Sequence, residues 1–258
     1  MRGLSATSGV IEPVHISPAP PEASVLVVCE HASNHIPDIY GGLGLSEELQ
    51  ASHIAWDPGA LPVAEKIARQ LAAPLVAGTV SRLVYDCNRP PEAASAVPAQ
   101  SEIYRVPGNE NLTPAARHER VASVYEPFQV ALKQEITRRG AALNLMVTIH
   151  SFNPTYRGHH REVEIGLLHG VDAVFANKML QLTPPDCPYV VRLNEPYSAA
   201  DGVAHTLDVQ GAANGLLSVM IEVRNDLLTS AAEQTLIARL LGNWVAATQA
   251  ALVREGTR

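Results

Sequence analysis

Short, continuous apolar runs alternate along this chain with amphipathic helical patterns. Such runs are typical of strands that are buried on both faces of a sheet. The strands are predicted at residues 24–29, 73–78, 83–85, 143–149, 163–168, 189–193 and 216–223. The helices are predicted at residues 58–72, 113–139, 172–182 and 230–252. This alternation predicts an α/β protein with three α/β/α layers, in which a mostly parallel mixed sheet lies between two layers of helices.

Two of the predicted helices begin with recognisable capping residues. Thr113 precedes Pro114 in the arrangement of an N-cap followed by proline in the first turn. Ser230 and Glu233 have the spacing of a capping box. These signals fix where the helices start.

The chain is long enough for one large domain. Of its 258 residues, 47% are hydrophobic and 17% are charged, which favours a packed core over disorder. Residues 1–23 are rich in proline, serine and alanine, so we predict an irregular N-terminal arm there. Residues 24–258 then form a single α/β domain.

Charge and cysteine content limit which classes of partner and which cellular compartment are expected. The formal net charge is −7 without a basic face, so nucleic acid is not an expected partner. No run reaches the ~20 apolar residues of a membrane span, and no signal peptide is visible. Cys29, Cys87 and Cys187 are far apart, which favours a reducing, cytoplasmic setting and a bacterial cytosolic protein. The oligomeric state stays open between monomer and homodimer.

Polar side chains that could bind a ligand or take part in a reaction follow the predicted strands. They are His31, Asn88, Arg89, His150 and Glu222. In a parallel sheet the carboxyl ends of the strands meet at one edge, and ligands bind there. We therefore predict one functional site built from these residues.

Two of these histidines suit a metal site. His31 and His150 each follow an apolar run, and a catalytic zinc takes three protein ligands plus water. Asp57 could supply the third ligand, or it could cap the helix that follows it. Glu30 and Asn34 remain alternatives, and His53 is a weaker one.

Glu222 is an acidic residue inside the strongly apolar segment 219–223. Burying a carboxylate is costly unless it is paired or used. Alternate residues share one face of a strand, so Glu222 and Arg224 are expected to face one site together. Glu222 is then a candidate general base, and an ion pair with Arg224 is the structural alternative.

The segment 81–90 suits the capture of a carboxylate. Its Asn88 and Arg89 place an amide beside a planar guanidinium, and Arg82 lies just before them. Tyr197, in a later polar loop, is a further candidate substrate contact. Cys87 could be read as a nucleophile, but the adjacent Asp86 would raise its pKa and no base is nearby.

Five motifs together resemble the N-formylglutamate amidohydrolase family. They are C-E-H-A-S-N-H-I-P at 29–37, H-I-A-W-D-P-G-A at 53–60, S-R-L-V-Y-D-C-N-R-P at 81–90, T-I-H-S-F-N-P-T-Y at 148–156 and I-E-V-R-N-D-L at 221–227. The resemblance implies a zinc-carboxypeptidase-like (phosphorylase/hydrolase-like) fold and one zinc ion. It also implies that Asn88 and Arg89 bind the substrate carboxylate, that Arg82 serves as an oxyanion or carboxylate arginine, and that Glu222 is the base.

One motif departs from the carboxypeptidase-like relatives, which take two zinc ligands from H-x-x-E. Here the segment reads His31-Ala32-Ser33-Asn34, with an amide in place of the glutamate. The third ligand is therefore expected elsewhere, and Asp57 is our choice among the alternatives.

These observations predict a metal-dependent hydrolase acting on a small N-acylated acidic amino acid, such as N-formyl-L-glutamate. Two other functions fit less well. One is a peptidase or amidase that removes an acidic residue from a small peptide, and the other is a non-catalytic protein that binds dicarboxylates.

Overall fold

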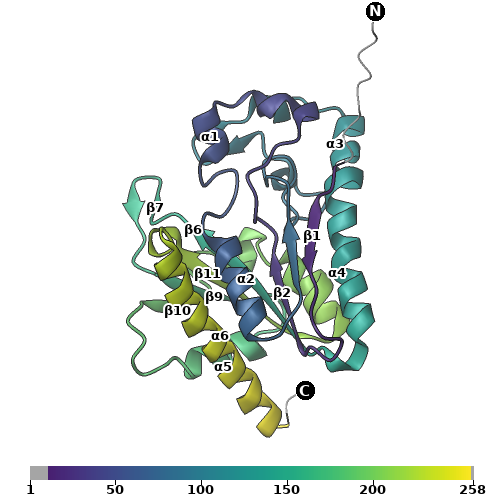
Figure 1. Cartoon of the computed structure of the whole chain (residues 1–258). Coiled ribbons are helices and arrows are strands. Elements are labelled where there is room, and N and C mark those ends of the chain that lie inside the picture. The colour runs from purple at the N-terminus through teal and green to yellow at the C-terminus, as the bar shows by residue number, and fades with distance from the viewer. Residues whose placement is uncertain (1–10, 257–258) are drawn as a thin grey trace, which may run out of the picture.

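A computed structural model describes residues 11–256 of the chain (Figure 1). Its main sheet contains the strands β1 (Val14–Ser17), β2 (Val25–Cys29), β3 (Leu75–Gly78), β6 (Leu145–Phe152), β9 (Ile165–Leu168), β10 (Val191–Leu193) and β11 (Leu217–Arg224). The α-helices are α1 (Glu47–Ala51), α2 (Ala60–Gln70), α3 (Pro114–Arg120), α4 (Glu126–Arg139), α5 (Val174–Gln181) and α6 (Ala231–Arg254). Two small hairpins join β4 (Gln100–Ser101) to β5 (Tyr104–Arg105) and β7 (Thr155–Tyr156) to β8 (His159–His160).

The sheet is mixed and mostly parallel. Its strand order is β1-β3-β2-β6-β11-β9-β10, and the four strands β3, β2, β6 and β11 run parallel. The edge strand β1 is antiparallel to β3, and β9 with β10 runs against β11. The carboxyl ends of β3, β2, β6 and β11 therefore meet at one edge of the sheet.

Helices cover both faces of this sheet, as Figure 1 shows. Helices α2, α5 and α6 pack on one face, and α6 contacts both α2 and α5. Helix α4 packs on the other face, and residues 207–211 contact β6 and β11. The predicted three-layer α/β/α fold is confirmed.

Alternate side chains of the central strands enter the two cores. In β6, Leu145 and Val147 pack towards α2 and α6, whereas Met146 packs towards α4. His150 and Glu222 have the same parity as Met146 and Met220, so both face the α4 side at the end of their strands.

Both helix caps predicted from the sequence are present. The Thr113 side chain accepts a hydrogen bond from the backbone amide of Ala116, and Ser230 and Glu233 form a reciprocal capping box. Helix α6 is long and apolar enough to cross a membrane by length and composition, but half of that stretch is buried inside the protein. Its buried apolar side chains, among them Leu241 and Trp244, belong to the core.

Two predicted elements are wrong. Residues 82–84 form a turn, closed by the hydrogen bond from the Val84 amide to the Ser81 carbonyl at 2.9 Å, so the strand predicted at 83–85 is absent. Leu83, Val84 and Tyr85 bury their side chains in the core on the α4 side. The N-terminal arm is not irregular throughout, since residues 14–17 pair with β3 as the edge strand β1. Residues 1–10 of that predicted arm lie outside the described residues.

Candidate metal centre and active-site cavity

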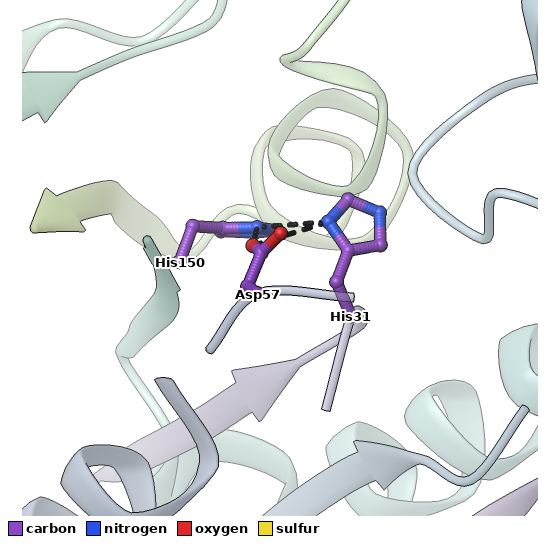
Figure 2. A group of neighbouring side chains, drawn as sticks. All are labelled: His31, Asp57 and His150. Atoms are coloured by element: carbon purple, nitrogen blue, oxygen red, sulfur yellow. Dashed lines mark hydrogen bonds and ion pairs between the residues drawn. The ribbon is translucent and has the colours of Figure 1, made fainter. Parts of the chain in front are cut away.

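Three buried side chains converge at the carboxyl edge of the sheet (Figure 2). His31 follows β2, Asp57 precedes α2, and His150 lies within β6. The Nδ1 atoms of the two histidines are 3.2 Å apart. Oδ2 of Asp57 lies 3.3 Å from Nδ1 of His31 and 2.9 Å from Nδ1 of His150.

The local backbone explains how Asp57 reaches the two histidines. The amide of Asp57 donates to the His31 carbonyl at 2.9 Å, which ties the two loops together. Its carboxylate accepts a hydrogen bond from the amide of Ser151 at 3.3 Å. Gly59 is the N-cap residue of α2 and no side chain caps that helix. The Asp57 side chain thus faces the histidines rather than capping α2.

A second carboxylate stands behind each histidine. Oδ1 of Asp86 lies 2.7 Å from Nε2 of His31. Oε2 of Glu30 lies 3.1 Å from Nε2 of His150, a contact at ion-pair distance whose alignment falls short of a hydrogen bond. In the neutral tautomer that a metal ligand needs, a proton on each Nε2 would face these acids and each Nδ1 lone pair would face Asp57.

The charges of the cluster are strongly coupled. Burial acts to lower the pKa of His150, but Glu30 and Asp57 outweigh it and raise that pKa well above its usual range. Burial likewise acts to raise the pKa of Asp57, yet His31, His150 and the Arg82 guanidinium together lower it. Asp86 has a lowered pKa for the same reason, because His31 and Arg82 outweigh its burial.

Acidic groups outnumber permanent cations in this cluster. Glu30, Asp57, Asp86 and Glu222 are buried, and Arg82 bridges Asp57 and Asp86 at 3.2 and 2.8 Å. Buried carboxylates need compensating charge. Nδ1 of His31, Nδ1 of His150 and an oxygen of Asp57 could therefore hold a metal cation, which the surrounding acids would stabilise.

Glu222 lies directly beside this triad. It is the Cα partner of His150 in the β6–β11 ladder, and it is only 5% exposed. Its Oε2 atom has no hydrogen-bond partner among the described residues. Burial, helped by Asp57, raises the pKa of Glu222 to about 7 against the opposing effect of His150 and Arg82. A carboxyl group with this pKa can both accept and donate a proton near neutral pH.

A cavity of about 390 Å³ opens onto the cluster. The residues predicted from the sequence that line it are His31, His53, Asp57, Arg82, Asn88, Arg89, His150, Tyr197 and Glu222. The structure thus brings together residues from six separate segments of the chain.

Arg224 is the exception, because it does not line this cavity. Its guanidinium donates to Asp226 at 2.9 Å, to Glu164 at 3.2 Å and to the Arg161 carbonyl at 3.1 Å. The expectation that Glu222 and Arg224 share one site is therefore wrong: the acids beyond the end of β11 hold Arg224 outside it.

Asn88 and Arg89 contact the segment 202–206 across the cavity wall. The Asn88 amide donates to the Val203 carbonyl at 2.5 Å, and its oxygen accepts from the Thr206 amide at 2.9 Å. Arg89 donates one amino group to the Gly202 carbonyl at 2.5 Å. The Asn88 side chain thus holds the wall in place, while Arg89 keeps donors for the cavity.

Other candidates from the sequence take different places. Glu30 stands behind His150, Asn34 donates to the Gln50 carbonyl at 3.0 Å, and His53 pairs with Glu102 at 3.0 Å on the cavity wall. Sequence reasoning gave Asp86 no role of its own at the metal centre. Its place between Arg82 and Asn88 in a polar turn was the available signal.

Burial raises the pKa of both the Cys29 and the Cys87 thiol well above the usual range, and Asp57 or Asp86 adds to the effect. Both residues therefore stay as neutral thiols, which argues against a cysteine nucleophile.

Comparisons with known proteins show the family and the fold of the chain. A family model described as N-formylglutamate amidohydrolase matches residues 23–229. The gene product Atu2144 from Agrobacterium tumefaciens has a similar structure, with 46% identity and a TM-score of 0.89 over 93% of this chain and 96% of that one. An N-formylglutamate amidohydrolase from Ralstonia eutropha JMP134 shares the fold, at 17% identity and a TM-score of 0.59 over 95% of this chain and 100% of that one. None of the curated proteins matches the chain.

Proposed function

The chain belongs to the N-formylglutamate amidohydrolase family, and we propose that it is a zinc-dependent hydrolase of N-acylated acidic amino acids such as N-formyl-L-glutamate. The products are formate, or another small acid, and the free amino acid. The observation that carries this proposal is Glu222, a buried carboxyl group with a raised pKa beside the His31–Asp57–His150 triad. The widely spaced cysteines favour a cytoplasmic enzyme.

His31, Asp57 and His150 are the residues that would hold the zinc ion. Nitrogen and oxygen ligands about 2.0–2.1 Å from a tetrahedral zinc lie roughly 3.3 Å apart. The three candidate atoms are 2.9 to 3.3 Å apart, and zinc binding would displace the proton that the raised pKa of each histidine retains, so the donor set fits. When bound, zinc polarises the acyl carbonyl and acidifies water.

Glu222 moves the protons of the reaction. Its carboxylate accepts a proton from water as the water oxygen bonds to the acyl carbon. The same proton then passes to the amide nitrogen as the carbon–nitrogen bond breaks and the amine leaves. A pKa of about 7 suits both steps.

Two arginines bind and stabilise the negative charges of the substrate. The Arg82 side chain is 29% exposed, and it keeps donors for the developing oxyanion beyond those used on Asp57 and Asp86. Arg89 grips the α-carboxylate, and Asn88 fixes the adjoining wall through its bonds to Val203 and Thr206. Tyr197 completes the same cavity.

Glu222→Gln is the decisive variant. We expect it to bind zinc as the wild type does and to lose roughly 10²- to 10⁴-fold in kcat on N-formyl-L-glutamate, because it lacks the proton acceptor. Metal content and release of glutamate are measured together. Glu48→Gln, an exposed change, is the matched control and is expected to behave as wild type.

Full turnover by Glu222→Gln would refute the mechanism. Release of amino acids only from peptides ending in an acidic residue would favour a peptidase. Binding of dicarboxylates without any turnover would favour a non-catalytic binding protein.

A further inference from the structure

A second cavity of about 500 Å³ adjoins the active-site cavity. Tyr156, Tyr197 and Asp201 line both cavities, so the two meet at these residues. Arg161 lines only the second cavity. A substrate group that passes the two tyrosines therefore approaches Arg161.

Three aromatic rings surround the Arg161 guanidinium. Its central carbon lies 4.7 Å from the ring centre of Tyr156, 4.8 Å from that of Tyr197 and 5.5 Å from that of Phe152. One amino group donates to the Tyr197 hydroxyl at 3.1 Å and to the Asn153 carbonyl at 3.2 Å. These contacts fix the plane of the guanidinium and leave its second amino group and Nε without a protein partner among residues 11–256.

Arg161 also lacks a carboxylate partner. Across the described part of the chain no acidic oxygen lies within 4.0 Å of it, although Glu162, Glu195 and Asp201 line the same cavity. The Asp201 carboxylate accepts hydrogen bonds from Ser198 instead.

Two other side chains near the site do have a carboxylate partner. Arg82 is paired with Asp57 and Asp86, and His53 is paired with Glu102. Arg89, like Arg161, bonds only to neutral oxygens among residues 11–256. Within the described range Arg192, which lines the second cavity, likewise bonds only to a neutral carbonyl, but Arg161 is the guanidinium that Tyr156 and Tyr197 hold where the two cavities meet. Arg89 and Arg161 can thus each bind one carboxylate.

We propose that Arg161, with Phe152, Tyr156 and Tyr197, forms a second carboxylate subsite that selects substrates carrying an acidic side chain. This inference rests on the proposed function. Arg89 then binds the α-carboxylate at the reacting end, and Arg161 binds the distal carboxylate. Neutral N-acyl amino acids leave Arg161 unused, so the subsite determines specificity.

Arg161→Met tests the subsite with N-formyl-L-glutamate and its neutral isostere N-formyl-L-glutamine. We expect kcat/KM for the glutamate derivative to fall roughly 10- to 100-fold, mainly through KM, because a charge-assisted contact is lost. The value for the glutamine derivative stays unchanged. Arg157→Met is the matched control: Arg157 lies 5.3 Å from the Tyr156 ring and lines neither cavity. An equal fall for both substrates, or no fall, would overturn the subsite.

A second measurement separates this subsite from the proposed catalysis. Calorimetric titration with L-glutamate and L-glutamine needs no turnover, so it reports on the subsite even if the chain hydrolyses neither substrate. A preference for L-glutamate that Arg161→Met abolishes supports the subsite, and equal affinities for the two ligands in the wild type refute it. If Arg161→Met does not fold, Tyr197→Phe, which removes only the hydroxyl contact, is expected to weaken the same preference in part.

Discussion

Two buried acidic residues contact the histidines on the side of each ring that faces away from Asp57. Glu30 and Asp86 face the Nε2 atoms of His150 and His31, while both Nδ1 atoms face Asp57. Carboxylates in such positions set the tautomer and the orientation of a ligand histidine. They also supply negative charge that a cation can compensate.

Glu30→Gln is expected to weaken metal binding roughly 10- to 100-fold, because an amide neither fixes the His150 tautomer nor adds charge. Competition between the metal-free protein and a chromophoric chelator measures the affinity for zinc. Glu47→Gln, on the exposed first turn of α1, is the matched control and is expected to leave it unchanged. An unaltered affinity in Glu30→Gln would show that Glu30 has no part in the site.

Glu222 makes the stability of the metal-free protein depend on pH. Its pKa in the folded protein is about 7, above the ordinary value of 4.5, so the folded state holds a proton that the unfolded state releases between those values. The contribution of Glu222 to stability is therefore lost as pH rises from about 4.5 through 7.

Glu222→Gln removes the stability cost of ionising this buried carboxyl group. We take the unfolding free energy of the variant minus that of the wild type at each pH. We expect this difference to be up to about 3 kcal/mol larger at pH 8 than at pH 4.5. Urea unfolding in the presence of a chelator measures the difference. A stability difference between the two proteins that is the same at both pH values would contradict the raised pKa.

At the scale of elements, Gly78 shows how the sheet positions the site. A Cβ atom there would lie 2.2 Å from the carbonyl oxygen of Glu30, so the end of β3 passes directly against the loop that carries Glu30 and His31. Only glycine permits this approach without moving the backbone.

Gly78→Ala is therefore expected to displace the His31 loop, lowering both zinc affinity and the melting temperature. Metal titration and thermal unfolding are the measurements. Gly140→Ala is the matched control: an alanine at its φ of +50° and ψ of −130° would be strained by roughly 1 to 3 kcal/mol, but a Cβ there meets nothing within 4 Å. It should lose some stability while keeping full metal affinity. Equal zinc affinity in the two variants would rule out the role assigned to Gly78.

The sequence predicted the strands that carry the site better than the turns between them. Continuous apolar runs located β2, β6 and β11, because a strand buried on both faces needs apolar residues at every position. The run at 83–85 has the same composition but forms a turn, since tertiary packing alone decides whether such a short segment pairs in a sheet.

Site residues show the same division. His31 and His150 could be named from the strand ends and Asp57 from its place just before a predicted helix, and the structure brings the three together. The partners of Asn88 and Arg224 could not be named. Asn88 bonds to residues 203 and 206, and Arg224 to Glu164, so these contacts depend on distant segments that no local pattern specifies.

At the scale of the whole molecule, the candidate metal centre lies at the edge of a core that apolar side chains fill. Apolar side chains fill both faces of the sheet, one cluster under α2, α5 and α6 and the other under α4. Cohesion of this kind comes from buried apolar area. The protein is therefore expected to fold without metal, unlike a small domain whose structural zinc organises its core.

Removing the metal should then lower stability without unfolding the chain. Binding to the folded state alone contributes about 2.7 kcal/mol when free zinc is 100 times its Kd. For a chain of this size that corresponds to a rise of roughly 5 to 10 °C in melting temperature. Circular dichroism melts with chelator and with zinc measure the shift, and His31→Ala should show almost none of it. Loss of helical signal at 25 °C in chelator would instead mean that the acids around His31 and His150 cannot stay buried without a cation, and that the core alone does not hold the fold.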